Sequence, residues 1–254
     1  MAGPKKKRAV VMIPTYNEAE NIAELVRDIL ALQVPFDLQV LVADDNSPDG
    51  TWKIVQGLAR RDRHVHLLRR MKRRGRGSGG IDGFQASLNL GADYVVEMDG
   101  DFSHRPCHIP ALLEAAGRTD IVLGSRFIKG GRDADRSLLR RFITWLVRRF
   151  VRSQFRLPVR DVSSGFRVFR RRVLEALDLD DLISVGPSVV LETLSKAHLL
   201  GFSIGEVPIV FVDRTRGKTK LSFLTLLETL VMAFQFKKRF AKLSPAREKR
   251  RRTH

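Results

Sequence analysis

The stretch that decides the fold of this chain is YVVEMDGDFSH, residues 94–104. Tyr94–Met98 has the pattern of a buried strand, and Asp99–His104 forms the loop at its carboxyl end, the edge where open α/β sheets bind ligands. Asp99 and Asp101 lie close enough to repel each other, and a bound cation would satisfy both. Oxygen ligands favour Mg²⁺ or Mn²⁺, which usually hold the phosphates of a substrate. On this stretch alone, a solvated acidic turn is an equally good interpretation.

The segments around this stretch alternate between strand and helix patterns. We expect strands at 9–13, 38–43, 65–68, 94–98, 121–124 and 204–212, and helices at 18–32, 51–61, 81–90 and 106–116. Such alternation is typical of parallel strands with helices on both faces of the sheet. The sequence therefore predicts an α/β fold with a mostly parallel central sheet and a nucleotide-binding core over residues 9–130.

Two further polar loops follow predicted strands, PTYNE at 14–18 and DDNSPDG at 44–50. A parallel sheet places both at the edge that carries the acidic loop described above. The carboxylates of Asp44 and Asp45 could accept hydrogen bonds from a base N–H and from ribose hydroxyls. The alternative is a turn with a helix cap at Asp49, which leaves the adjacent pair of carboxylates unexplained.

Residues 75–80 are rich in glycine, and we expect them to form a loop before the helix at 81–90. Such a loop either brings backbone N–H groups close to a phosphate or serves as a flexible turn. No Gly-Lys-Ser/Thr sequence follows these glycines, which excludes a P-loop.

Charge is the unusual global property of the chain. Its 254 residues include 46 Lys and Arg against 28 Asp and Glu, a formal net charge of +18. Such a surface attracts anions: nucleic acid, an anionic membrane or a phosphorylated substrate. The single cysteine, Cys107, excludes an internal disulfide framework and indicates a reducing compartment. No apolar stretch reaches the roughly 20 residues of a membrane span, and the N-terminal sequence predicts no secretory signal.

Two segments have the pattern of helices that lie in a membrane interface. Residues 136–157 combine an apolar face with seven flanking arginines. Residues 221–236 are apolar nearly all round, with Glu228 as their one charge, and three basic residues follow at 237–239. This second segment is short for a span and suited to the headgroup plane. Packing of the second helix on the core of its own domain is an equally open alternative.

Several motifs together resemble a known enzyme family. PTYNE, DDNSPDG and the DGD of residues 99–101 are similar to motifs of family-2 glycosyltransferases with the GT-A fold. GSRF at 124–127, DVSSGFR at 161–167 and GEVPIVFVDR at 205–214 resemble those of dolichyl-phosphate mannosyltransferases and their bacterial polyprenyl-phosphate relatives. The resemblance covers about residues 9–222. It implies a GT-A fold, the Rossmann-like architecture of nucleotide-diphospho-sugar transferases, followed here by C-terminal interfacial helices.

The resemblance also implies an activity and a site. The enzyme would transfer mannose from GDP-mannose to a polyprenyl (dolichyl) phosphate, with inversion and with Mg²⁺ or Mn²⁺ as cofactor. The nucleotide sugar would be bound by Pro14, Tyr16, Glu18, Asp44, Asp45, Asp99 and Gly100, and the metal by Asp99, Asp101 and Ser103. The acceptor phosphate would be held by Arg126, Arg140, Arg214 and Lys220. The catalytic residues would be Asp101, Arg126, Arg214 and Lys220.

The residue types fit this chemistry. A nucleotide-activated sugar leaves behind a diphosphate whose developing charge needs cations. A lipid phosphate is already anionic at neutral pH, because the second pKa of a phosphomonoester is roughly 6. The acceptor therefore needs positioning rather than a strong general base, and a site rich in arginine supplies it.

The expected organisation is a basic arm at 1–8, a catalytic domain at 9–220, an amphipathic, membrane-interface helix at 221–240 and a basic tail at 241–254. We expect a peripheral protein on the cytoplasmic face of a membrane, where a membrane-anchoring partner subunit could hold it. One alternative is a UDP-glucose-dependent polyprenyl-phosphate glucosyltransferase. Another is a basic nucleic-acid-binding module. The carboxylates gathered at one edge would repel nucleic acid unless a cation is bound, so no nucleic-acid partner is expected.

Overall fold

The computed structural model describes residues 6–72, 74–133, 138–212 and 223–240. Within them, seven strands form the main sheet in the order β3-β2-β1-β4-β7-β5-β8, and β6 pairs with β9 in a second sheet. The strands of the main sheet are β1 (Arg8–Thr15), β2 (Asp37–Asp44), β3 (Val65–Arg69), β4 (Tyr94–Glu97), β5 (Ile121–Ser125), β7 (Arg167–Arg170) and β8 (Ile204–Pro208). The second sheet consists of β6 (Arg132–Asp133) and β9 (Val210–Phe211).

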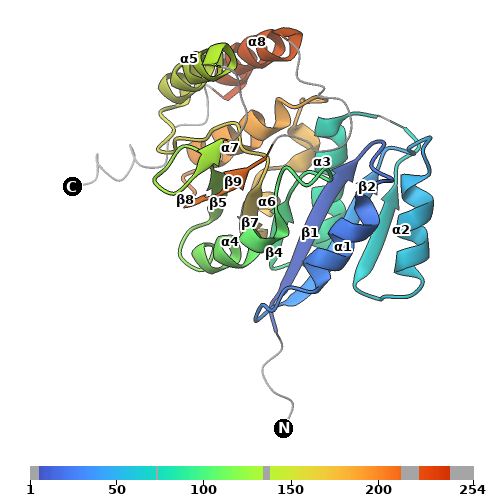
Figure 1. Cartoon of the computed structure of the whole chain (residues 1–254). Coiled ribbons are helices and arrows are strands. Elements are labelled where there is room, and N and C mark those ends of the chain that lie inside the picture. The colour runs from blue at the N-terminus through green and yellow to red at the C-terminus, as the bar shows by residue number, and fades with distance from the viewer. Residues whose placement is uncertain (1–5, 73, 134–137, 213–222, 241–254) are drawn as a thin grey trace.

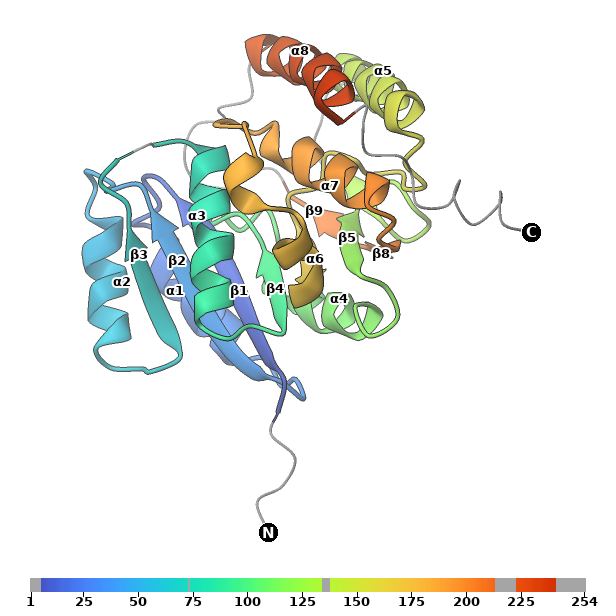
Figure 2. The same ribbon diagram turned by 180° about the vertical axis from the view of Figure 1, so that it is seen from behind.

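Helices cover both faces of the main sheet (Figures 1 and 2). The α-helices are α1 (Ile22–Leu30), α2 (Thr51–Ala59), α3 (Arg76–Asn89), α4 (Ile109–Ala115), α5 (Leu138–Phe155), α6 (Arg171–Ala176), α7 (Val189–Leu199) and α8 (Phe223–Arg239). The short 3-10 helices are η1 (Pro106–His108) and η2 (Leu179–Asp181). One apolar core lies between the sheet and α1, α2 and α4, and the other between the sheet and α3, α5, α6, α7 and α8.

The sheet is parallel except for β7, which confirms the mostly parallel prediction. β7 runs antiparallel between β4 and β5, and its first residue, Arg167, pairs in register with Glu97 at the end of β4. No pattern in the sequence predicted this strand. Its reversal brings the loop before β7 to the same edge as the carboxyl ends of the parallel strands.

The glycine-rich segment does not form the expected loop, because α3 already begins at Arg76. Glycines are poor helix formers, so tertiary packing must select them here. A Cβ on Gly77 would lie 2.6 Å from the backbone oxygens of Ser184 and Gly186, and one on Gly83 would lie 2.6 Å from Sδ of Met12. The small residues therefore let α3 approach both β1 and the loop before α7.

Two other local expectations need correction. The cap residue of α2 is Gly50, with φ of 88°, although the carboxylate of Asp49 does accept hydrogen bonds from the N–H and hydroxyl of Thr51. The strand expected over 204–212 is divided into β8 and β9, which belong to different sheets. The division lies at Ile209, whose N–H donates to Ser125 and whose carbonyl accepts from Arg132.

A buried carboxylate, Asp120, ties the start of β5 to the segment before β8. Its Oδ2 accepts hydrogen bonds from the N–H and hydroxyl of Ser203, and its Oδ1 accepts from Nε of Arg172 at 2.8 Å. Burial alone would raise the pKa of Asp120, but the hydrogen bonds from Arg172 and Ser203 outweigh burial and lower it. The carboxylate therefore stabilises the fold in its ionised form.

Helices α5 and α8 pack against each other beyond the carboxyl edge of the sheet (Figure 1). Among the described side chains of α8, Ala233 and Phe236 are buried in the core, whereas Val231 and Phe234 are about half exposed. The helix thus packs on the core of its own domain and also presents apolar surface, and its contact with a membrane stays a prediction. Of the helices that the structure describes, none is long and apolar enough to cross a bilayer.

Candidate active site

The carboxyl ends of β1, β2 and β4 meet at one edge of the sheet, since these strands are neighbours and parallel. The three polar loops predicted to lie together therefore do so. They are also joined directly: the N–H of Asn17 donates to the hydroxyl of Ser47, and the N–H of Glu18 donates to the hydroxyl of Thr51, both at 3.0 Å. These contacts fix the first two loops relative to each other.

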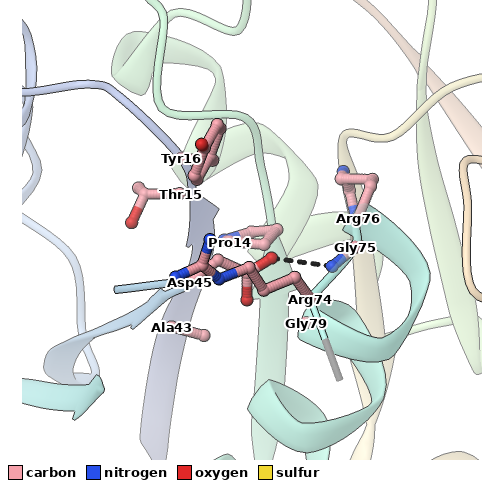
Figure 3. A pocket seen from close by; sticks show the side chains of 9 residues that line it. All are labelled: Pro14, Thr15, Tyr16, Ala43, Asp45, Arg74, Gly75, Arg76 and Gly79. Carbon is pink, nitrogen blue, oxygen red and sulfur yellow. Dashed lines mark hydrogen bonds between the residues drawn. The ribbon is translucent and has the colours of Figure 1, made fainter. Parts of the chain in front are cut away.

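A cleft of about 320 Å³ opens at this edge between the loop after β1 and the start of α3 (Figure 3). Its lining residues are Pro14, Thr15, Tyr16, Ala43, Asp45, Arg74, Gly75, Arg76 and Gly79. Tyr16 is partly exposed and Asp45 is buried. Figure 3 shows the hydrogen bond between the N–H of Gly75 and Oδ2 of Asp45, 2.8 Å long, that joins the two sides of the cleft.

The two adjacent carboxylates after β2 have different environments. Asp44 is fully buried and accepts hydrogen bonds from the hydroxyl of Thr15 and from both the N–H and hydroxyl of Ser47. Asp45 pairs with the buried guanidinium of Arg70 and lines the cleft. Asp44 thus shapes the loop from within, and Asp45 is the carboxylate of the pair that lines the cleft.

Two other residues predicted to bind the nucleotide sugar, Glu18 and Gly100, do not line the cleft but support the loops around it. Glu18 is buried and accepts a hydrogen bond from Nδ2 of Asn21 at 2.9 Å. Gly100 lies against the β1 end, where an added Cβ would be 3.2 Å from Cγ2 of Thr15. The absence of a side chain at Gly100 therefore lets the acidic loop sit close to the loop after β1.

The acidic loop is held by its own side chains. The hydroxyl and N–H of Ser103 both donate to Oδ1 of Asp101, at 2.5 and 3.1 Å. The N–H of Asp99 donates to Nδ1 of His104 at 3.0 Å, so this ring nitrogen carries no proton. Burial lowers the pKa of His104, which stacks on the ring of Phe166, and keeps the imidazole neutral. Asp99 remains partly exposed, whereas Asp101 is buried.

The carboxylates of Asp99 and Asp101 supply oxygen ligands of the kind that hard divalent cations such as Mg²⁺ prefer. Among the described residues, no three His, Cys, Asp or Glu side chains form a metal-binding group. A Mg²⁺-like ion needs no such group, because one or two carboxylates suffice when phosphate oxygens and water complete its coordination. The cleft is linked to this loop through Arg76, which lines the cleft and donates to Asp99.

An ion-pair network lies directly beneath this loop. Glu97 and Arg167 are fully buried, and Nε and a second guanidinium nitrogen of Arg167 donate to Oε2 of Glu97. Arg76 donates from one nitrogen to Oε1 of Glu97 at 2.8 Å and from another to Oδ1 of Asp99 at 3.1 Å. Burial alone would raise the pKa of Glu97, but Arg167 and Arg76 outweigh burial and lower it. This network was not predicted from the sequence, although a glutamate inside an apolar strand was a signal for it.

Arg126, at the end of β5, is held in place by a second buried pair. Its guanidinium donates to both oxygens of Asp161 at 2.8 Å and to the hydroxyl of Ser163 at 2.8 Å. Glu206 accepts hydrogen bonds from the N–H groups of Arg160 and Asp161 and so fixes the backbone there. Burial alone would raise the pKa of Asp161, but the bonds from Arg126 outweigh burial and lower it. Arg126 is thus positioned from β5, β8 and the loop before β7 together.

The other predicted phosphate-binding residues are described less completely. Arg140 belongs to α5, and its side chain lies outside the described part of the structure. Arg214 and Lys220 fall between β9 and α8, outside the described residues. The structure therefore brings Asp45, Asp99, Asp101 and Arg126 to one edge of the sheet, and the roles of all the predicted site residues stay predictions.

Comparison with known proteins identifies the family. The model of glycosyl transferase family 2 matches residues 10–178. The chain belongs to glycosyl transferase family 2. As a member of this family, the protein is a glycosyltransferase, as its motifs predicted.

Two curated relatives of this glycosyltransferase align with most of the chain. It is 40% identical to the undecaprenyl-phosphate mannosyltransferase of Micrococcus luteus, an alignment that covers 85% of this chain and 88% of that protein. It is 34% identical to the polyprenol monophosphomannose synthase of Mycolicibacterium smegmatis, over 88% of this chain and 84% of that protein.

The fold is also found among solved structures. A mannosyltransferase of Pyrobaculum calidifontis, in complex with GDP-Man and Mn²⁺, matches with a TM-score of 0.63 at 20% identity. The match covers 93% of this chain and 65% of that one. At this level of identity the likeness establishes the fold alone, and it confirms the predicted GT-A architecture.

Proposed function

We propose that this glycosyltransferase transfers mannose from GDP-mannose to a polyprenyl phosphate and forms polyprenyl-phosphate mannose. The names of the two curated relatives support the reaction, and the GDP-Man complex of the structural neighbour supports the donor. The observation that carries the proposal is the common sheet edge where the Asp45 cleft, the Asp99 and Asp101 carboxylates and the anchored Arg126 lie together.

The cleft lined by Asp45 would hold the nucleoside. Guanine presents two adjacent N–H donors to a carboxylate, whereas uracil presents one, so a carboxylate in this position favours GDP over UDP. Tyr16 and Pro14 would supply contact surface for the base at the mouth of the cleft. UDP-glucose, the alternative donor, would use fewer of these contacts.

Asp99 and Asp101, together with Ser103, would hold Mg²⁺ or Mn²⁺. The bound cation would neutralise the charge that develops on the leaving diphosphate. Gly75 and the first turn of α3 border the cleft on the side of this loop. The protein would thus contribute a metal site at the leaving group.

The acceptor phosphate would be bound by Arg126, with Arg140, Arg214 and Lys220 completing its surroundings. Because Asp161 and Ser163 fix the Arg126 guanidinium, the charge is already oriented before the acceptor arrives. A phosphate oxygen would attack the anomeric carbon in line with the departing diphosphate, which inverts that centre. No side chain needs to remove a proton, since the acceptor is already anionic.

The lipid acceptor would be reached through α5 and α8. The half-exposed apolar side chains of this pair are Trp145, Leu146, Val231 and Phe234. Exposed basic side chains accompany them at Arg149, Lys237 and Lys238. Apolar burial and attraction to anionic headgroups would act together, as in helices that lie in a membrane interface. The protein would work on the cytoplasmic face of a membrane, on its own or with a membrane-anchoring partner subunit.

Nucleotide binding tests the donor assignment. With Mn²⁺ present, calorimetry should give a dissociation constant for GDP on the order of tenfold below that for UDP. Asp45→Asn should abolish most of this preference. Asp82→Asn is the matched control, because Asp82 also pairs with Arg70, at 2.8 Å, but does not line the cleft. A preference for UDP, or an equal effect of both substitutions, would contradict the proposed donor.

A further inference from the structure

Arg76 has no part in the proposed glycosyl transfer, but it contacts Asp99, a predicted metal ligand. Its guanidinium bridges Oε1 of Glu97, at 2.8 Å, and Oδ1 of Asp99, at 3.1 Å. Burial alone would lower the pKa of Arg76, but the two carboxylates outweigh burial and raise it. A permanently charged cation is therefore bound to one of the two carboxylates that are expected to take the metal.

Two glycines leave the space that this guanidinium occupies. A Cβ on Gly80 would lie 3.5 Å from one terminal nitrogen of Arg76. A Cβ on Gly165 would lie 3.4 Å from the other and 3.7 Å from Oδ2 of Asp99. Both distances are those of van der Waals contact, so the guanidinium lies closely between the two glycines. The slot, formed by α3 and the loop before β7, holds Arg76 beside Asp99.

Neutralisation of Glu97 does not account for the presence of Arg76. Oε2 of Glu97 already accepts hydrogen bonds from the fully buried Arg167. The feature that Arg76 adds is its second contact, with Asp99. Since the side chain of Asp99 is 34% exposed, water could satisfy this carboxylate without an arginine.

The charges of the loop explain what this contact does to a divalent cation. This loop and the end of β4 carry three carboxylates, Glu97, Asp99 and Asp101, and the guanidiniums of Arg76 and Arg167 pair with the first two. The cluster therefore carries one net negative charge, and without Arg76 it would carry two. A site this weakly negative attracts a divalent ion poorly, and the diphosphate of a donor supplies the missing charge.

We propose that Arg76 is a resident counter-ion that shares Asp99 with the catalytic metal and makes metal binding depend on the donor. In the free enzyme the guanidinium occupies one oxygen of Asp99 and keeps the affinity of the loop for the divalent cation low. When the donor diphosphate and the metal bind together, the metal binds to Asp99. Arg76 lines the cleft and then faces the diphosphate. Arg76 acts through Asp99 as a positioning residue. The inference rests on the metal site of the proposed function.

The test measures Mn²⁺ binding by electron paramagnetic resonance, with and without GDP. In the unmodified protein, GDP should strongly increase the affinity for Mn²⁺, and by linkage Mn²⁺ should increase the affinity for GDP by the same factor. In Arg76→Gln, nucleotide-free Mn²⁺ binding should tighten on the order of tenfold, as expected when one unit charge near a divalent ion is removed and water screens much of its effect. The enhancement by GDP should shrink accordingly.

Three variants control this result. Arg76→Lys keeps the charge and should retain weak nucleotide-free binding. Arg76→Met removes the charge without adding a polar group and should behave like Arg76→Gln, which guards against a folding defect in either variant. Arg74→Gln removes a charge from the same cleft and should change nucleotide-free Mn²⁺ binding less than Arg76→Gln does.

Two outcomes would overturn the inference. If Arg76→Gln and Arg76→Met fold and bind nucleotide-free Mn²⁺ no more tightly than the unmodified protein, Arg76 has only a structural role. This result would leave the proposed function intact as long as GDP still promotes Mn²⁺ binding and Asp99→Asn abolishes it. If the unmodified protein binds no Mn²⁺ even with GDP, the metal site of the proposed function is wrong as well.

Discussion

Substitution of Glu97 by Gln tests the buried network beneath the acidic loop. Glu97 and Arg167 have no exposed surface, and Nε of Arg167 lies 2.9 Å from Oε2 of Glu97. Gln preserves the shape of the side chain but leaves the guanidinium of Arg167 buried beside a neutral amide. Removing one partner of a buried ion pair costs about 3–5 kcal/mol, because the remaining charge is desolvated without compensation.

Urea unfolding followed by circular dichroism measures this loss directly. We expect the free energy of unfolding to fall by about 3–5 kcal/mol. The thermal midpoint should fall by roughly 6–20 °C, given the entropy of unfolding typical of a chain of this size. A loss of this magnitude is a large fraction of the roughly 5–15 kcal/mol that stabilises most domains.

Two controls separate charge from packing. The double variant Glu97→Met with Arg167→Met removes both charges at similar volume, and it should be more stable than Glu97→Gln. Glu114→Gln removes a carboxylate from an exposed pair with Arg118 and should have no measurable effect. A loss below about 1 kcal/mol for Glu97→Gln, or a double variant less stable than the single one, would refute the reasoning.

Three further predictions concern the site, the fold and the membrane. Asp161→Asn should lower kcat/KM for transfer by about 10- to 100-fold, since Arg126 loses its charged anchor; unchanged kinetics would dissociate Arg126 from the reaction. Asp120 has a lowered pKa in the folded protein, so its stabilisation is present above about pH 4 and is lost as the pH falls further. Asp120→Asn should therefore flatten the acid limb of a stability–pH curve, and an unaltered limb would contradict this. Replacing Trp145 and Phe234 with Ser should remove the salt-resistant part of binding to anionic liposomes, because salt screens charge but not apolar burial; retained binding at high salt would exclude this surface.

Much of the catalytic edge could be predicted because it depends on local patterns. An apolar strand followed by polar residues identifies the carboxyl end of a strand, and parallel pairing then brings such ends together. Asp45, Asp99 and Asp101 lie where this reasoning placed them. The same reasoning could not separate Asp44 from Asp45, since the direction of each side chain depends on partners that are distant in sequence.

The features that the sequence analysis missed all depend on long-range packing. Glu97 and Arg167 are 70 residues apart, and their pairing requires the antiparallel insertion of β7, which no local pattern announces. The glycines of α3 favour a loop by propensity, but the loop before α7 comes so close to Gly77 that only glycine fits. In both cases tertiary contacts overrule the local signal.

The most direct test of the proposed function is a transfer assay with radiolabelled donors. The purified protein is incubated with a polyprenyl phosphate, Mg²⁺ or Mn²⁺, and labelled GDP-mannose or UDP-glucose, and the label in the lipid phase is counted after extraction. We predict labelled lipid from GDP-mannose, none after EDTA treatment, and a fall of at least about 100-fold in Asp101→Asn, which keeps the shape of the loop but removes a charged ligand. Transfer from UDP-glucose instead, or efficient transfer that persists in EDTA and in Asp101→Asn, would contradict the account.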